Sequence, residues 1–398
     1  MTSRAVEKLF DTLGILDSSD SEELRRLASV HTGRQSSGQV RPSIPKLYSR
    51  ARQPTIAKSE SARIAIARVV HRVPEAVVKV SSVAKTTGRV WAHLTYITRN
   101  GRIVAETDGG QQLTCLEDVR ELQEYWSGCP TKQRTNGKLA VNFVLSMPAG
   151  TNVERLTSAV RAFSRDAFAG HEYAFVLHTP DTDPDPQAPP HPHAHICVRA
   201  GSVSGKRLLH GPSELWAFRQ LFAQKLREQE IDAVATPRSV RGVVKKAARQ
   251  DLYHISKDRQ KKDRRSTVGL AKLREAAKAV LNGTKIDGIW EARVAQRRDE
   301  LCTGWLALAG GLEASGRSED TLLGRDIRRF VSNLPAPRTE RQDIARQMRE
   351  RRDELDRRKG KQAMSASPTD AARPESKTAG LTATPVRNRA RGKDDYER

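Results

Sequence analysis

The sequence predicts an α+β fold in which an antiparallel sheet is flanked by helices, followed by a helical, basic C-terminal extension and a disordered tail. Short apolar runs of strand length alternate with longer amphipathic segments, which is typical of a mixed domain. Two of these runs, 173–178 and 193–200, are joined by a loop that returns the chain, and this favours antiparallel pairing. After residue 232 the pattern is charged and helical, and from about 360 the chain is rich in Ala, Ser, Thr and Pro.

The first 73 residues are expected to form two short helices and then a flexible basic arm. The helices are predicted over 4–14 and 20–30. From His31 to Arg72 the chain holds nine Lys/Arg and one acid, Glu60, in a segment rich in Ser, Pro and Gln. Such a composition indicates a segment with little core of its own.

Residues 74–232 carry the strand and helix patterns and are expected to form the main domain. The expected strands are 75–80, 138–147, 173–178 and 193–200, and the expected helices are 88–101, 114–126, 151–170 and 212–229. Two of the helices begin with a capping-box pattern, and two end at a glycine. These residues are Thr114 with Glu117, Thr151 with Glu154, Gly101 and Gly170. A charged helical extension is predicted over 233–359, and a disordered tail over 360–398.

The chain is strongly basic. It carries 70 Lys+Arg against 47 Asp+Glu, a net charge of +23, and this excess favours a polyanionic partner, either nucleic acid or an anionic membrane surface. A basic protein without such a partner is the alternative. The sequence has neither an apolar run long enough to span a membrane nor a secretory signal. Its four cysteines are scattered, so we expect a cytoplasmic protein without disulfides or a thiolate metal site.

Four of the ten histidines lie between residues 178 and 195. In the run from His193 to Ala200 the alternation of a strand puts His193 and His195 on one face, together with Cys197 and Arg199. His178 ends the neighbouring expected strand, so pairing of the two strands would bring three imidazoles together. Three histidines leave ligand positions open, as a catalytic metal requires.

The other polar residues of this loop are less clearly part of such a site. Asp181, Asp183 and Asp185 follow His178, and they are expected either to orient the imidazoles or to be a solvated acidic loop. His191 lies in a proline-rich turn and is excluded from the predicted metal site.

A tyrosine lies on the helix expected over 88–101. Val90, Leu94 and Ile97 mark its buried stripe. Tyr96 falls on a neighbouring polar stripe with Arg89 and His93, and Arg99 is close by. A phenol beside guanidinium groups ionises more easily and can act as a nucleophile. Packing at the rim of the core is the alternative role of Tyr96.

Three segments, "HLTYITRNGRIVAE", "VNFVLSMPAGT" and "FVLHTPDTD…HPHAHICVRA", together resemble the motifs of the DNA relaxases in the same order. These are conjugative nicking enzymes with a His-hydrophobic-His signature, and the branch most similar to this chain is that of the T-DNA border endonucleases and mobilisation proteins. The resemblance covers about 75–232. It implies that Tyr96 is the nucleophile and that His178, His193 and His195 bind the metal, with Asp181 or Asp183 as the family's acidic residue.

The resemblance also implies a reaction. The tyrosine attacks a phosphodiester of single-stranded DNA at an origin of transfer and stays attached to the 5′ end, with Mg²⁺ or Mn²⁺ withdrawing charge from the phosphate. Two departures from the family are the long segment before Tyr96 and the inserted "PDPQAPP". Implied partners are an accessory DNA-binding protein and the coupling protein of a type IV secretion system, for plasmid conjugation or mobilisation.

Basic residues outside the site are expected to contact DNA. They are Arg89, Arg99, Lys245, Lys246 and Arg249. The segment 238–265 is expected to contact phosphates, and the arginine-rich end, 380–398, to be a secretion signal or an uninvolved tail. Alternatives to a relaxase are a replication initiator or transposase with the same chemistry, and a non-enzymatic DNA-binding accessory protein.

Overall fold

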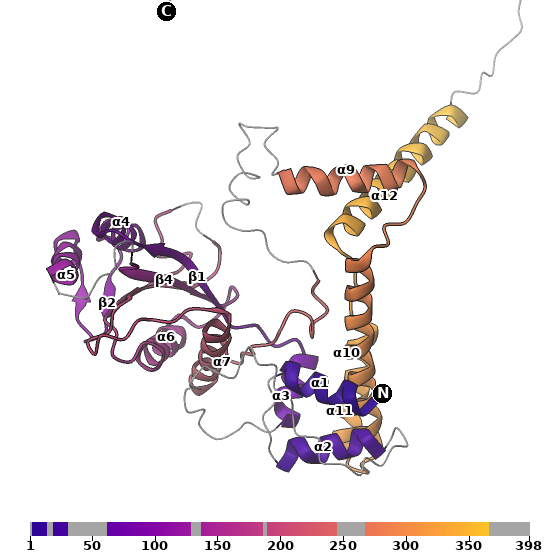
Figure 1. Ribbon diagram of the computed structural model, residues 1–398, viewed down its shortest axis with the longest axis horizontal. Helices are drawn as coiled ribbons and strands as arrows, with labels where there is room; N and C mark the ends of the chain where they lie inside the picture. The colour runs from indigo at the N-terminus through magenta and orange to yellow at the C-terminus, as the bar shows by residue number, and fades with distance from the viewer. Residues whose placement is uncertain are drawn as a thin grey trace, which may run out of the picture.

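The protein is described by a computed structural model for residues 2–13, 19–30, 62–128, 137–185, 189–244 and 267–365 (Figure 1). These residues form an antiparallel sheet with helices on both faces, and a separate group of long helices. The predicted α+β class is therefore confirmed, including the helical character of the C-terminal region.

The sheet has six strands within the described residues. They are β1 (Val77–Ala84), β2 (Ala105–Thr107), β3 (Gln112–Leu113), β4 (Ala140–Ser146), β5 (Tyr173–His178) and β6 (His193–Arg199). Their order across the sheet is β1-β4-β6-β5-β2-β3, and every pair is antiparallel. The pairing of β5 with β6 confirms the arrangement expected for the two strands around the histidines.

Two helices, α6 (Val153–Ala167) and α7 (Pro212–Glu228), cover one face of the sheet. Their apolar sides bury a cluster with the even-numbered residues of β6, from Ala194 to Ala200. This cluster is rich in aromatic rings, and Phe163 contacts Phe168, Phe218 and Phe222 edge to face. The helix predicted over 212–229 is therefore present as α7, and its apolar residues Phe222 and Leu226 are buried in this cluster.

The other face carries α4 (Thr87–Ile97) and α5 (Leu116–Gly128). Val90, Leu94 and Ile97 of α4 are buried, as predicted. After α4 the chain turns sharply at Gly101. Its φ of +78° is a left-handed backbone angle that favours glycine. A Cβ added at this residue would lie only 2.3 Å from the Leu116 nitrogen, so there is no room for a side chain. The turn places the end of α4 beside the start of α5.

Both predicted capping boxes differ from the structure by one residue. In the first turn of α5 the carboxylate of Asp118, rather than that of Glu117, accepts hydrogen bonds from the backbone N–H groups of Thr114 and Cys115. Before α6 the cap is Asn152, whose side chain accepts from the Arg155 N–H. In both cases the capping side chain belongs to the residue next to the predicted one. Its oxygen can accept the same kind of hydrogen bond from the N–H groups at the helix start.

A second core joins helices from both ends of the chain. It consists of α1 (Thr2–Leu13), α2 (Ser19–Val30), α3 (Ala62–Val70), α10 (Ile289–Glu313) and α11 (Ser318–Ser332). Figure 1 shows the long helix α10 with α1 and α2 against it. The two N-terminal helices were predicted, but α3 lies in the segment expected to be a flexible arm. Ile66 of α3 is fully buried in this core, so apolar residues at helical spacing outweigh the basic composition there.

A further pair of helices, α9 (Thr267–Leu281) and α12 (Glu340–Ser365), packs through a small apolar cluster. The residues Lys245, Lys246 and Arg249, most of the segment 238–265, and the end 380–398 lie outside the described residues. No helix in the described ranges is long and apolar enough to cross a membrane.

Candidate metal centre

The register of β5 and β6 brings three histidines together. His178 is paired directly with His193, and the alternation along β6 returns His195 to the same face. One nitrogen atom from each ring lies within 4.8 Å of those from the other two. All three side chains are buried, so this is an enclosed cluster of imidazoles at one end of the two central strands.

Hydrogen bonds orient two of the three rings. His193 Nδ1 lies 3.1 Å from the His191 carbonyl oxygen. Because a carbonyl only accepts, Nδ1 carries the proton and Nε2 keeps its lone pair. His178 Nδ1 lies 2.8 Å from the Asp183 carboxylate. A carboxylate that holds the far nitrogen of a histidine is a common support of metal ligands.

The third ring, His195, has a buried Nδ1 with no hydrogen-bond partner among the described groups. Burial, and then the charges of His178 and His193, lower the pKa of His195 to about 2. Burial likewise lowers the pKa of His193. Both rings are therefore neutral at physiological pH, which is the form that binds metal ions, and the free nitrogen of His195 suits a ligand.

The first histidine also contacts helix α4. His178 Nε2 lies 2.6 Å from the Ile97 carbonyl oxygen, which is at the last residue of that helix. Both nitrogens of His178 therefore face acceptor oxygens. A metal ion held through Nε2 would replace the contact with Ile97. The three histidines therefore fit a metal ion, with one contact to be exchanged on binding.

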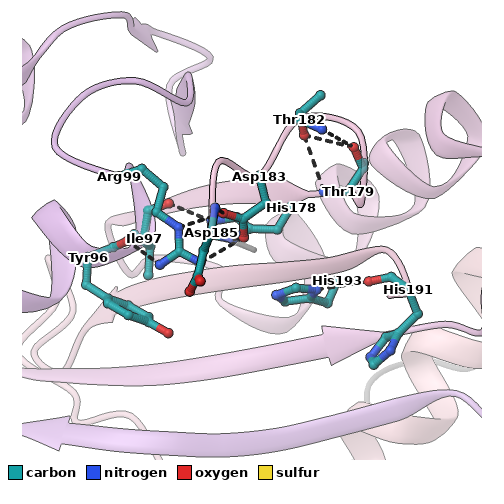
Figure 2. A network of polar contacts seen from close by, with 10 residues as sticks. All are labelled: Tyr96, Ile97, Arg99, His178, Thr179, Thr182, Asp183, Asp185, His191 and His193. Carbon is teal, nitrogen blue, oxygen red and sulfur yellow. Dashed lines mark hydrogen bonds and ion pairs between the residues drawn. The ribbon is translucent and has the colours of Figure 1, made fainter. Parts of the chain in front are cut away.

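The charged partner of the cluster is Asp183, and Figure 2 shows how it connects Arg99 with His178. Arg99 donates through Nε and Nη2 to the two carboxylate oxygens, at 2.8 and 2.7 Å. These bonds hold the pKa of the Asp183 carboxyl well below its usual range and raise the pKa of Arg99. The result is a chain of contacts from the imidazole through the carboxylate to the guanidinium.

The same guanidinium lies over the ring of Tyr96, with its central carbon 4.8 Å from the ring centre. Arg99 reaches this place because it and Asn100 have left-handed backbone angles, with φ of 51° and 58°. Tyr96 is 55% exposed, and its ring centre is 6.1 Å from that of His195. A solvent-accessible phenol therefore lies beside the buried histidines, within a cation–π contact.

The structure thus brings together most of the predicted site residues. His178, His193, His195, Tyr96, Arg99 and Asp183 form one connected group. Asp183 is the acid that contacts His178, and Asp181 is exposed. His191 contributes its carbonyl and lies outside the group of three. Arg89 is exposed in the first turn of α4, away from the histidines.

A residue that the sequence did not single out as part of the site is His93. It lies one turn before Tyr96 on α4, with its ring centre 6.5 Å from that of His195. Its Nε2 is buried without a partner among the described groups, and burial lowers its pKa to about 4. The only signal in the sequence was the spacing of three residues from Tyr96, which puts both on one side of the helix.

The chain matches no known protein-family model, and a search of curated proteins finds no match. What is established is a buried three-histidine cluster that could hold a metal ion, in an α+β fold with an antiparallel sheet.

Proposed function

We propose that the protein is a metal-dependent nicking and joining enzyme of the relaxase type, which acts on single-stranded DNA at an origin of transfer. The observation that carries the proposal is the position of Tyr96, an accessible phenol beside a buried cluster of three histidines. Its motifs resemble those of the relaxases in their order. The basic charge of the chain, +23, suits a nucleic-acid substrate.

In this reaction the phenolic oxygen of Tyr96 forms a bond to phosphorus, and the bond from phosphorus to the 3′ oxygen breaks. The phenolic proton is balanced by the proton that the leaving 3′ oxygen takes up. The product is a 5′-phosphotyrosine and a free 3′ hydroxyl. Because the bond energy is kept in the new ester, the reverse attack by a 3′ hydroxyl reseals the strand.

Each of the other residues has a defined part. Arg99 lies over the Tyr96 ring in a cation–π contact and places a positive charge beside the reacting residue. Asp183 fixes Arg99 and the ring of His178 at the same time. His178, His193 and His195 would hold Mg²⁺ or Mn²⁺, which as a Lewis acid withdraws charge from a bound phosphate.

A covalent adduct tests the proposal. The full chain is incubated with Mn²⁺ or Mg²⁺ and labelled single-stranded oligonucleotides that tile the origin region of its element, and adducts resistant to sodium dodecyl sulfate are resolved on a gel. We expect an adduct with the wild type and none with Tyr96→Phe, which keeps the ring and removes the nucleophile.

The matched control is Tyr125→Phe, since Tyr125 is similarly exposed at 58% but lies on α5. It should form the adduct as the wild type does. Adduct formation by Tyr96→Phe would contradict the assignment of the nucleophile. A wild-type chain that binds the oligonucleotides without any adduct would instead favour a DNA-binding accessory protein.

A further inference from the structure

A second feature lies on the α4 side of the sheet, at the opposite end of β6 from the histidines. It is a shallow recess that is open to solvent. Its lining includes Thr87 and Val90 of α4, Trp126 of α5, Lys138, Arg199 and Arg207. We call this feature the basic recess.

The lining is cationic. Lys138, Arg199 and Arg207 contribute three positive charges, and among the described residues that line the recess there is no carboxylate. Arg199 is bonded to Glu172 nearby, which offsets part of its charge. Arg207 is exposed and donates to the backbone carbonyl oxygen of Lys138, and the Lys138 ammonium lies 3.0 Å from His210 Nε2, so two exposed cations lie on adjoining parts of the recess. Such a pair attracts an anion that bridges them.

The recess is also lined by a tryptophan whose indole nitrogen is covered by neighbouring atoms. Trp126 is only 8% exposed, and its indole Nε1–H has no hydrogen-bond partner among the described groups. A buried N–H without a partner is unfavourable, and the indole nitrogen can only donate. An acceptor oxygen of a ligand that displaced the covering atoms would satisfy it. The start of α4 at Thr87 adds the positive end of a helix dipole on the same side.

The recess is connected to Tyr96 by the surface of α4. Tyr96 is nine positions after Thr87, a distance of about 14 Å along a helix. The exposed side between them carries Arg89 and the small residue Ala92. A polyanion that lay along this side would contact first Arg89, then the small apolar side chain of Ala92 and then Tyr96.

We propose that the basic recess binds a phosphate group of the single-stranded DNA whose reacting phosphate lies at Tyr96. The proposal rests on the function proposed above and adds a second contact point a few nucleotides from the reacting bond. Lys138 and Arg207 would contact the phosphate through charge, and Trp126 would donate a hydrogen bond. Two contacts separated by the length of α4 fix the direction of the strand, which a single contact at the metal does not.

Binding without cleavage tests the recess. Full-length protein carrying Tyr96→Phe is titrated into a fluorescent single-stranded oligonucleotide over a series of salt concentrations, and the anisotropy is recorded. The recess variant Lys138→Gln/Arg207→Gln should weaken binding by about tenfold or more, and it should lower the slope of log affinity against log salt by about 0.7, the value for one lost phosphate contact on a single strand.

The matched control is Arg155→Gln/Arg165→Gln, which removes the same charge from α6 on the opposite face of the sheet. It should change affinity and slope little. Trp126→Phe should weaken binding several-fold with an unchanged salt slope, since the lost donor is neutral. Equal losses in the recess and control variants would overturn the proposal, because net charge alone would then explain them.

Inorganic phosphate separates the two sources of the anion. If calorimetry shows that the recess variant loses binding of inorganic phosphate while its affinity for the oligonucleotide is unchanged, the recess takes a free anion and the proposal is wrong. Because all of these measurements use a chain without Tyr96, they do not depend on cleavage. A missing adduct would therefore contradict the proposed function and leave the recess to be judged by binding.

Discussion

The sheet region (β1 to α7) and the helical region (α1–α3 and α9–α12) differ in how their buried charged groups and histidines are hydrogen-bonded. In the helical region the buried charged groups are paired within the protein, as Asp320 is with Arg63 and Glu291 with Arg341. In the sheet region His195 and His93, whose ring centres are 6.5 Å apart, each keep a buried nitrogen without a partner among the described groups; in the helical region the indole nitrogen of Trp305 is also buried without one. Buried polar groups are normally satisfied, so unsatisfied ones that gather in one place indicate a ligand. The comparison separates a region that holds the chain together from one that is prepared to bind.

The two regions also differ in how the chain builds them. The sheet and its covering helices come from one continuous stretch, from β1 to α7. The helical core instead joins α1–α3 to α10 and α11, which are more than 200 residues away in the sequence. Stability of the helical region therefore depends on contacts between the two ends of the chain.

The largest expected effect is loss of that helical core. Trp305 of α10 is fully buried and contacts Phe330 of α11 edge to face. Trp305→Ala should lower the free energy of unfolding of the helical region by about 3–5 kcal/mol. Urea denaturation followed by hydrogen exchange of each region measures it.

Trp290→Ala is the matched control, since Trp290 lies on the same helix and is 62% exposed. It should change the stability little. The three histidines should still bind metal in Trp305→Ala below the urea transition. Loss of metal binding there would show that the sheet region does not fold independently of the helical core.

The next effect concerns the metal. His195→Ala removes the ligand whose nitrogen is left free, and the affinity for Mn²⁺ should fall by more than about 100-fold, beyond the range seen when only a supporting residue is lost. Calorimetry on the full chain gives the dissociation constant. His71→Ala is the control in the helical region, where His71 is exposed and contacts Asp326. Equal affinities for all three proteins would show that the cluster is not a metal site.

The two regions should also lose stability in different pH ranges. The folded-state pKa values of His93 and His195 are lowered to about 4 and about 2, so below about pH 6.5 the unfolded chain binds more protons than the folded one. Stability of the metal-free sheet region should fall as the pH drops from 6.5 towards 4.5, by up to about 1.4 kcal/mol per pH unit for each histidine.

The helical region should lose stability only at a lower pH. Arg341 lowers the pKa of Glu291 to about 2, and Arg63 lowers that of Asp320. A carboxyl with a lowered pKa stabilises the fold above its unfolded value near 4 and loses this effect as the pH falls further. Hydrogen exchange of both regions over pH 4–7, in the presence of a chelator, shows which region loses stability first as the pH falls. Loss of stability in both regions at the same pH would contradict this order. So would a His93→Gln variant in which stability of the sheet region depends on pH as steeply as in the wild type.

The sequence predicted the site better than its surroundings, for a physical reason. Alternation along β6 and the position of His178 at the end of β5 are local patterns, and the register of the two strands converts them directly into proximity. The contact of Arg99 with Asp183 depends on left-handed residues after α4, so the sequence could not choose between Asp181 and Asp183. His93 was missed as a site residue because its burial depends on how α4 packs on the sheet.

The helical core was predicted least well. The helical patterns of α1 and α2 are local and were recognised, but their partners lie near the other end of the chain, and no local pattern identifies them. Helix α3 was not predicted because the segment around it is rich in basic residues. One of these residues, Arg63, forms an ion pair with Asp320 of α11. Relaxase activity and the DNA and secretion partners stay predictions.

The smallest expected effect tests the corrected cap of α6, which covers the sheet face opposite the histidines. The sequence predicted Thr151 as the capping residue, whereas the side chain of Asn152 accepts from the Arg155 N–H at 2.9 Å and Thr151 donates to the Pro148 carbonyl. Removing a cap leaves a helix N–H unsatisfied, so Asn152→Ala should lower the free energy of unfolding of the sheet region by about 1 kcal/mol. Thr151→Ala is the matched control and should have the smaller effect, and neither change should alter metal affinity or the helical region. Urea denaturation of the two variants measures both effects. A larger loss of stability in Thr151→Ala than in Asn152→Ala would favour the capping box predicted from the sequence.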